Sequence, residues 1–536
     1  MERIAIIDLG SNSIRFIIMQ VTGAGAYKLI YQEKKSIRLS EGMTKEDRML
    51  TEAAQRRALD CLRVYAHAAR VLHVTKILAV ATAAVRSARN GASFLKRVRT
   101  TTGIPMTIIS GREEARLGFS GVIHTIDERD FLLFDLGGAS VEISLVKDKR
   151  RLHSVSIPMG AVTLTELFGS ADTVSAEKKA QIQRYIRRQL AAVPWLPRTP
   201  LPVIGIGGTV RNLAKIYQRR IQYPLPKLHN FQFPAKSLFP LVDELCRKNF
   251  AERKRISGLS SERADIIIAG ALVGFLVCYV TGSNWLVSLT GAESLTISGC
   301  GIREGLFFHY YDPLYGKERD WEHRMLLSSV RNYRKTLPLD DLSHTRYVTA
   351  MADYLFDHWK SLHGLSDRDR LLLTAAGMLH DIGGLINYYS HARHSAYMIA
   401  NAHLFGLTHK EQLICSLIAA FHHGYSGKLL KTSSHLSLID GDDLSRVRKL
   451  SLFLSIAEGL DETKEQSITR LVCHTSPKAA ELRIYTNQDS FDVQAHALQP
   501  FLRPFEKTFG RPLDLQWFPG TRQPSLFKKE EPDLEK

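Results

Sequence analysis

The chain has 536 residues and a formal net charge of +18, with 44% hydrophobic and 24% charged residues. This length exceeds what one hydrophobic core usually serves, so we expect about three to four domains, and the composition argues against a largely disordered chain. The six cysteines are scattered without a CxxC pair, which argues against a zinc knuckle or a disulfide framework and is typical of the reducing cytoplasm.

The positive charge is concentrated in one part of the chain. Residues 1–305 hold 44 lysines and arginines against 26 aspartates and glutamates, which accounts for the whole excess. A basic surface of this kind attracts polyanions, but no groove-reading or base-stacking motif of nucleic-acid binding is present. Charge alone therefore leaves nucleic acid, a membrane surface and polyphosphate open.

The first 125 residues predict a sheet with covering helices. Short apolar or alternating runs predict strands, and longer amphipathic runs predict helices. We expect strands at 4–8, 13–21, 27–33, 76–81 and 106–109, and helices at 51–72, around 92–101 and after Ser110-Gly111.

The same pattern then starts again. An apolar strand at 131–135, a glycine turn and a second strand at 141–146 repeat the beginning of the chain, as "IAIIDLGSNSIRFIIM" and "FLLFDLGGASVEISLV" show. Both copies place Asp-Leu-Gly at a strand end. The repeat spacing of about 127 residues predicts two related α/β subdomains that face each other.

The rest of the chain predicts three further regions. Up to residue 305 we expect helices at 175–192 and 264–280, strands at 203–206, 285–289 and 295–298, and a loop at 224–240. The apolar run at 266–280 is shorter than a membrane-spanning helix, which needs about 20 apolar residues, so we expect a buried helix here. Residues 322–470 have a helical period and many histidines, and the last part predicts strands at 471–474, 481–485 and 513–517 around a helix near 499–508.

Three glycine turns follow apolar strands and are candidates for phosphate binding. They are Asp8-Leu9-Gly10-Ser11-Asn12-Ser13, then Asp135-Leu136-Gly137-Gly138-Ala139-Ser140 with Glu142 after it, and Gly205-Ile206-Gly207-Gly208-Thr209. Backbone N–H groups and hydroxyls in such turns can face a phosphate. The Asp8 carboxylate suits Mg²⁺, which prefers oxygen ligands. One such turn alone is as well explained as a hairpin, but three in this order favour a phosphate clamp.

Seven motifs give the chain a resemblance to a known family. They are "IDLGSNSIRFII" (7–18), "ATAAVRSARNG" (81–91), "IISGREEARLGFSGV" (108–122), "FDLGGASVEIS" (134–144), "GIGGTVRNLA" (205–214), "LSSERADIIIAGA" (259–271) and "SGCGIREGLF" (298–307). The sequence resembles the exopolyphosphatase / guanosine pentaphosphate phosphatase family, over essentially its whole length. The resemblance implies an α/β fold with two actin-like subdomains of the sugar-kinase and ribonuclease-H type at 1–125 and 126–305. An all-α HD-like domain at 306–467 and a small α+β unit at 468–536 are expected to follow.

The resemblance also implies roles for single residues. Glu114 of "SGREEAR" would be the general base that activates water, whereas its neighbour Glu113 is expected to be a solvated or capping residue. Arg86 would contact phosphate. Asp8, Asp135 and Glu142 would lie at a Mg²⁺ or Mn²⁺ ion, and the phosphate loops would comprise Gly10, Ser11, Asn12, Ser13, Gly137, Gly138, Ser140, Gly207, Gly208 and Thr209.

The second turn departs from the usual family pattern of three glycines followed by two hydroxyl residues. Ala139 stands in place of a glycine, and its methyl group restricts positive φ, so this loop is expected to sit slightly differently. Val141 lacks a hydroxyl. We interpret both changes as tuning of the site.

The histidine-rich region predicts a candidate second metal site. His344, His380-Asp381 and Asp461 have the order found in metal-dependent HD phosphohydrolases, and His391, His394, His422 and His423 could add ligands. The alternative is that these side chains are buried and hydrogen-bonded for structure. Substrate binding, gating or dimerisation is expected here rather than an independent second activity.

The predicted activity is exopolyphosphatase, the processive hydrolysis of terminal phosphates from inorganic polyphosphate by metal-assisted attack of water. Guanosine pentaphosphate (pppGpp) 5′-phosphohydrolase is the close alternative, and a polyphosphate or nucleotide sensor or an actin-like-fold kinase is the alternative of a different class. The resemblance further suggests a cytoplasmic homodimer with neither nucleic acid nor membrane as a partner.

Overall fold

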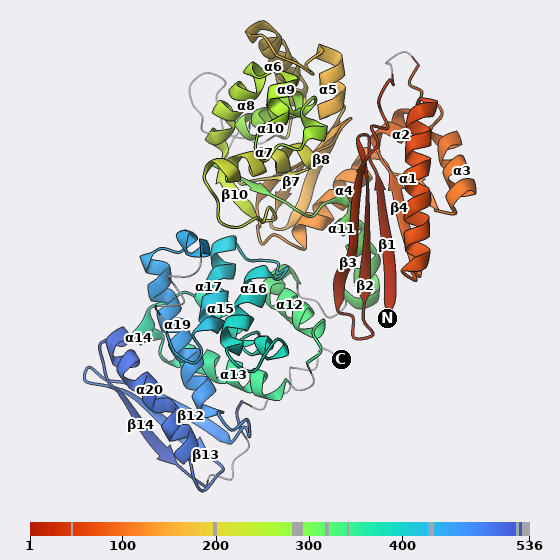
Figure 1. Cartoon of the computed structure of the whole chain (residues 1–536). Helices are drawn as coiled ribbons and strands as arrows, with labels where there is room; N and C mark the ends of the chain where they lie inside the picture. Colours follow the sequence, from red (N-terminus) through yellow and green to blue (C-terminus); the bar gives the residue numbers. More distant parts are fainter. Residues whose placement is uncertain are drawn as a thin grey trace. The chain divides into compact units, whose positions relative to one another are not determined.

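The computed structural model of the protein describes residues 1–43, 47–196, 201–280, 293–316, 321–339, 342–425, 427, 434–520 and 525–527. The chain forms two compact units, Met1–Lys317 and Glu318–Lys536, each with its own hydrophobic core (Figure 1).

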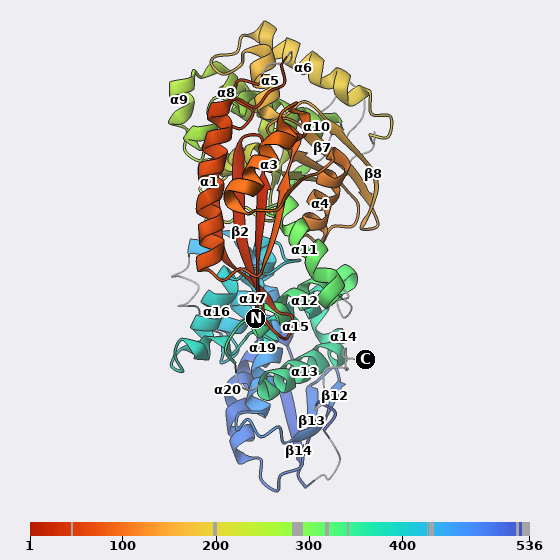
Figure 2. The ribbon, with the colours of Figure 1, turned by 90° about the vertical axis from the view of Figure 1, so that its right-hand side faces the viewer.

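The first sheet carries the beginning of the chain. It consists of β1 (Glu2–Leu9), β2 (Ser13–Val21), β3 (Tyr27–Ser36), β4 (Lys76–Ala81) and β5 (Met106–Ile108), in the order β3-β2-β1-β4-β5. Strand β1 is antiparallel to β2 and parallel to β4. The helices α1 (Glu52–Val71) and α3 (Gly91–Thr102) lie on the same side of this sheet (Figures 1 and 2), and α2 (Ala83–Ser87) follows β4.

Alternation of side chains along β1 explains why both faces of this sheet are covered. Ala5 and Ile7 pack in the core formed with α1, whereas Ile4 and Ile6 pack against Phe307 on the other face. Successive side chains of a strand point to opposite faces, so a strand with apolar residues in succession needs cover on both.

The second sheet repeats the first. It consists of β6 (Phe131–Leu136), β7 (Val141–Lys147), β8 (Arg150–Ile157), β9 (Val203–Ile206), β10 (Phe231–Pro234) and β11 (Ser294–Ile297), in the order β10-β11-β9-β6-β7-β8. The series β8-β7-β6-β9-β11 has the order and strand directions of β3-β2-β1-β4-β5. The predicted pair of related α/β subdomains is therefore confirmed.

A group of helices lies beside the second sheet. They are α5 (Ala161–Phe168), α6 (Ala176–Ala191), α7 (Gly208–Arg220), α8 (Leu238–Arg247), α9 (Phe250–Lys254) and α10 (Ile267–Val280). Helix α10 contacts α5, α6, α7 and α8, which explains its lack of a polar face. Among the residues that the structure describes, no helix is long and apolar enough to cross a membrane.

Two helices, α4 (Gly111–Ile123) and α11 (Ile302–Tyr315), pack closely against each other. A Cβ atom on Gly121 would lie 2.2 Å from the carbonyl oxygen of Gly301, and one on Gly305 would lie 1.9 Å from that of Leu117. Helix α11 also covers β1. The first unit therefore extends to Lys317, past the expected boundary at 305/306.

The second unit is a helical bundle with a small sheet. Its helices are α12 (Trp321–Lys335), α13 (Ser343–His358), α14 (Lys360–His363), α15 (Asp367–Gly377), α16 (His391–Asn401), α17 (His409–Ala420), α19 (Gly441–Leu460) and α20 (Asp492–Phe509). Its sheet has the order β12 (Ile468–Thr475), β13 (Ala480–Thr486), β14 (Leu513–Phe518). One core contains Trp359 of the bundle together with Ile484 and Phe505 of the terminal part. The expected division at 467/468 thus does not separate two cores.

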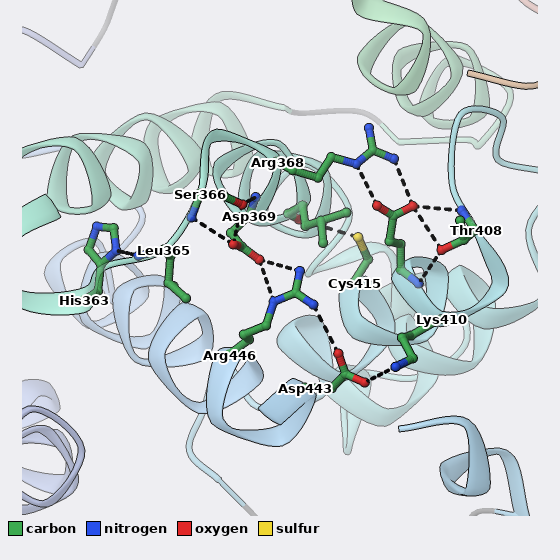
Figure 3. A network of polar contacts seen from close by, with 12 residues as sticks. His363, Leu365, Ser366, Arg368, Asp369, Thr408, Lys410, Cys415, Asp443 and Arg446 are labelled. Carbon is green, nitrogen blue, oxygen red and sulfur yellow. Dashed lines mark hydrogen bonds and ion pairs between the residues drawn. The ribbon is translucent and has the colours of Figure 1, made fainter. Parts of the chain in front are cut away.

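Ion pairs join α15, α17 and α19 beside this core (Figure 3). Arg446 of α19 bonds Asp369 at 2.6 Å and Asp443 at 3.1 Å, and Lys410 bonds Asp443 at 2.8 Å. Because the Asp369 and Asp443 side chains are nearly buried, these partners offset the cost of removing their charge from water.

Some local expectations were wrong. The predicted loop at 224–240 contains β10, a short 3₁₀ turn (Ala235–Ser237) and the start of α8, because Phe231 and Phe233 alternate into the core at the sheet edge. The expected strand at 285–289 lies outside the described residues.

Candidate active site

A cleft in the first unit is lined by all three predicted glycine turns. The turns follow β1, β6 and β9, and they contribute Asp8, Gly10, Ser11, Asn12, Ser13, Asp135, Leu136, Gly137, Gly138, Ala139, Ser140, Gly207 and Gly208. Other elements contribute Arg15, Thr82, Ala83, Glu114, Arg263 and Ile302. The carboxyl ends of neighbouring parallel strands meet at one sheet edge, which is where ligands of open α/β sheets bind.

The first two turns have the same hydrogen-bond geometry. The Gly10 N–H donates to the Ser13 carbonyl at 3.1 Å, and the Gly137 N–H donates to the Ser140 carbonyl at 3.0 Å. The two turns are therefore copies of one local structure, one in each subdomain.

The two copies touch at Gly138. A Cβ atom there would lie 3.1 Å from the Ser11 Cβ, so glycine permits the close approach. The alanine that replaces a family glycine causes no backbone strain, because Ala139 does not have a positive φ. Its carbonyl accepts a bond from the Gly160 N–H at 3.1 Å. Val141 is fully buried in the core of the second sheet, so its side chain does not line the cleft.

The third turn requires glycine for two reasons. Gly207 has φ +109°, a conformation that favours glycine. A Cβ atom on Gly208 would lie 2.0 Å from the Arg263 guanidinium. Thr209, which was expected to line the loop, is fully buried, with α10 packed closely against its side chain, and it does not line the cleft.

Glu114 and Glu113 have different surroundings, as predicted from their positions on α4. The Ser110 hydroxyl caps the helix by accepting from the Glu113 N–H, and the Glu113 side chain pairs with Arg116 at 2.7 Å. Glu114 is buried and faces the cleft. Arg86 donates to Glu114 Oε2 at 3.0 Å, so this arginine positions the glutamate and does not itself line the cleft.

The carboxylates that line the cleft have raised proton affinities, and so has Glu142, which is buried and does not line it. Burial, together with repulsion from Glu142, raises the pKa of Glu114 well above its usual value. Burial raises the pKa of Asp135 to about 6 and, with repulsion from Asp135, that of Glu142 to about 7. Burial also raises the pKa of Asp8. Glu142 accepts bonds from Ser140 and Ser156, each at 2.7 Å.

This group of buried carboxylates fits a divalent cation. A cation would relieve their mutual repulsion, and carboxylate oxygens suit Mg²⁺ and Mn²⁺. Among the described residues, however, no three of these carboxylates bring ligand atoms within 4.8 Å of one another. The arrangement that fits is one or two carboxylates with water as the remaining ligands.

Arg15 and Arg263 line the cleft but were not predicted from the sequence. Arg15 of β2 lies opposite Asp8 of β1 in the strand register. In the second copy Glu142 has the same position opposite Asp135. Alignment of the repeat could have identified it. Arg263 lies in the quoted motif "LSSERAD", but its place over the third turn depends on the approach of residues far apart in the sequence.

The second unit brings three of the four residues of the predicted second metal site together (His344, His380 and Asp461), with one addition. His344 lies 2.8 Å from Asp461 and 3.2 Å from Glu458, and His380 lies 3.0 Å from Glu458. The addition is Glu458, which stands three residues before Asp461 in the chain and was not predicted from the sequence. Asp381 faces away from this trio, toward His391 at 3.4 Å and Lys464 at 3.1 Å. The described residues contain two groups of potential metal ligands, His344 with His380 and Glu458, and His391 with His422 and His423. His394 belongs to neither group.

The duplicated α/β fold carries paired glycine turns and a buried glutamate at one cleft, an arrangement that suits the binding and transfer of phosphoryl groups. Comparison with known families agrees. The Ppx/GppA phosphatase family matches residues 17–312, and its domain III matches residues 327–499. The chain belongs to the Ppx/GppA phosphatase family and is a phosphoanhydride hydrolase.

Solved structures are similar to part of the chain. An exopolyphosphatase from Cytophaga hutchinsonii is 25% identical, with 58% of this chain and 98% of that chain covered and a TM-score of 0.52. The Aquifex aeolicus member of the Ppx/GppA family is 26% identical, with 58% and 97% covered and a TM-score of 0.49.

Proposed function

We propose that this hydrolase is an exopolyphosphatase that removes terminal phosphates in succession from inorganic polyphosphate. The observation that carries the proposal is the lining of the cleft. Among the described lining residues, the side chains are small, polar, charged or aliphatic, and none is aromatic. A polyphosphate end needs only charge and hydrogen-bond donors, whereas a nucleobase is commonly held by stacking on an aromatic ring.

The positive charge of the chain supports the same substrate. The whole formal excess of +18 falls within residues 1–305, the part that carries the cleft. Long-range attraction would concentrate a long polyanion near this part of the chain. A long chain of phosphates benefits from such attraction more than a single nucleotide does, because it carries more charge.

In the proposed reaction the paired turns and Arg263 hold the oxygens of the terminal phosphate. Glu114 orients a water molecule and accepts its proton, and its raised pKa suits that task. Arg86 fixes the glutamate by its bond to Oε2. A divalent cation, when bound at the cleft carboxylates, would neutralise charge on the phosphate oxygens, which is the main requirement of phosphoryl transfer.

The substrate is tested by side-by-side turnover. The purified protein is given inorganic polyphosphate or guanosine pentaphosphate under the same ionic conditions, and released phosphate is measured. We expect a higher kcat/KM for polyphosphate than for guanosine pentaphosphate. As added salt screens the attraction, the kcat/KM for polyphosphate should fall more steeply than that for guanosine pentaphosphate. A higher kcat/KM for guanosine pentaphosphate would overturn the substrate assignment. Formation of ADP from ATP and an acceptor, without phosphate release from either substrate, would overturn the hydrolase itself.

A further inference from the structure

The second unit contains a group of histidines that the proposed reaction does not use. Three of them, His391, His422 and His423, bring ligand atoms within 4.8 Å of one another, and His344, His380 and Glu458 form a second such trio. The trios are neighbours, because the rings of His380 and His422 are 5.0 Å apart.

The protonation of the rings is fixed by their partners. Nδ1 of His391 lies 3.0 Å from the Tyr388 carbonyl, Nδ1 of His422 lies 2.6 Å from that of Ala419, and Nδ1 of His380 lies 2.6 Å from that of Gly377. A carbonyl oxygen can only accept, so each Nδ1 carries the proton. In a neutral imidazole the Nε2 atom is then left with an unshared electron pair.

These Nε2 atoms point at one another. Nε2 of His391 lies 3.1 Å from Nε2 of His422 and 3.1 Å from Nε2 of His423, with Asp381 Oδ1 at 3.4 Å. Electron pairs held this close repel unless a cation lies between them. Nitrogen ligands at about 2.0–2.1 Å from a tetrahedral zinc ion are themselves separated by about 3.3 Å.

The neighbouring trio has a similar arrangement in the interior. Nε2 of His380 and Oε2 of Glu458 are 3.0 Å apart, and neither atom has another hydrogen-bond partner among the described groups. Both side chains are more than nine-tenths buried. Glu458 Oε1 lies 3.2 Å from Nε2 of His344, whose Nδ1 is held by Asp461 at 2.8 Å. A carboxylate that orients a histidine in this way is typical of the surroundings of metal ligands.

We propose that the second unit binds divalent transition-metal ions at two adjacent positions. One is formed by His391, His422 and His423, and the other by His344, His380 and Glu458. Imidazole-rich ligand sets favour ions such as Zn²⁺, Fe²⁺ or Ni²⁺ over Mg²⁺. Asp381, with Oδ1 3.4 Å from Nε2 of His391, is a positioning residue of the first position, and Asp461 is a positioning residue of the second.

Protonation is the competing explanation, because extra protons on the imidazoles could also fill the gaps between these atoms. The two explanations differ in their response to Co²⁺. A metal centre binds the ion and gives it visible absorption bands, whereas a protonated cluster does neither.

The test uses the full chain, stripped with a chelator and titrated with Co²⁺ or Zn²⁺. Metal content after gel filtration and the Co²⁺ absorption spectrum are measured. We expect about two ions per chain for the wild type and about one for His391→Gln and for Glu458→Gln, with no retention of Mg²⁺. His358→Gln is the matched control, because His358 lies in the same unit with Nδ1 bonded to a carbonyl, outside both trios.

The fold of each variant is checked by circular dichroism, and His423→Gln replaces His391→Gln if the latter does not fold. Fewer than two ions on the wild type would overturn the proposal. Equal retention by the wild type and by folded variants of both positions would overturn it as well.

Discussion

Substitution of Gly208 by alanine is predicted to displace Arg263 from the cleft. The added Cβ would lie 2.0 Å from Nη2 and 2.1 Å from Cζ of that arginine, far inside contact distance. The guanidinium of Arg263 occupies the place of the added Cβ, so it has to leave its position over the turn. The backbone around Gly208 needs no change, and the effect is expected on substrate binding more than on folding.

The magnitude follows from the bond that Arg263 would make with phosphate. A charge-assisted hydrogen bond contributes about 1.5–3 kcal/mol, which corresponds to a loss of about 10- to 150-fold in kcat/KM. The assay is phosphate release from polyphosphate by the wild type, Gly208→Ala, Arg263→Met and the double variant. Because alanine acts by displacing the arginine, the double variant should be no worse than Arg263→Met. Full additivity of the two losses, or an unchanged kcat/KM for Gly208→Ala, would refute the reasoning.

Two further predictions concern stability. Burial holds the pKa of Glu142 at about 7 in the folded chain, above its value of about 4.3 in an unfolded one. The folded state then binds more protons between these values, so stability falls as pH rises across that window. In the presence of a chelator, the melting temperature of Glu142→Gln relative to that of the wild type should therefore rise between about pH 5 and about pH 7.5. A difference in melting temperature that stays constant over this range would contradict the prediction. Gly305→Ala would place a Cβ 1.9 Å from the Leu117 carbonyl and force α4 and α11 apart. It should lower the free energy of unfolding in urea by about 1–3 kcal/mol. Gly23→Ala, with no atom within 4 Å of the new Cβ, is its control, and equal values for the two would contradict the packing argument.

The sequence predicted those parts of the fold whose signal is local. The hairpins β1–β2 and β6–β7 were found because an apolar strand, a glycine turn and a second strand follow each other directly. The strand β8 and the helix α5 were missed. Most side chains of β8 are exposed or only partly buried, so it lacks an apolar run, and α5 has only eight residues.

The candidate site was predictable to the same extent. The turn residues and Glu114 stand in motifs, and each motif folds on itself. Arg263 and Glu458 were missed because their roles arise from the approach of distant segments: α10 and its preceding turn onto α7 for the arginine, and α19 onto α13 for the glutamate. Thr209 belongs to its motif, yet α10 packs over its side chain. A motif shows which residues are neighbours in the chain, and packing decides which of them face the cleft.

The most direct test of the catalytic assignment compares two neighbouring glutamates. Phosphate release from polyphosphate is measured for the wild type, Glu114→Gln and Glu113→Gln. Loss of a positioned general base lowers kcat by about 10²- to 10⁴-fold, so Glu114→Gln should show that loss. Glu113→Gln, which removes only an ion pair with Arg116 on a partly exposed helix face, should retain activity. Equal activity of the two variants would contradict the account.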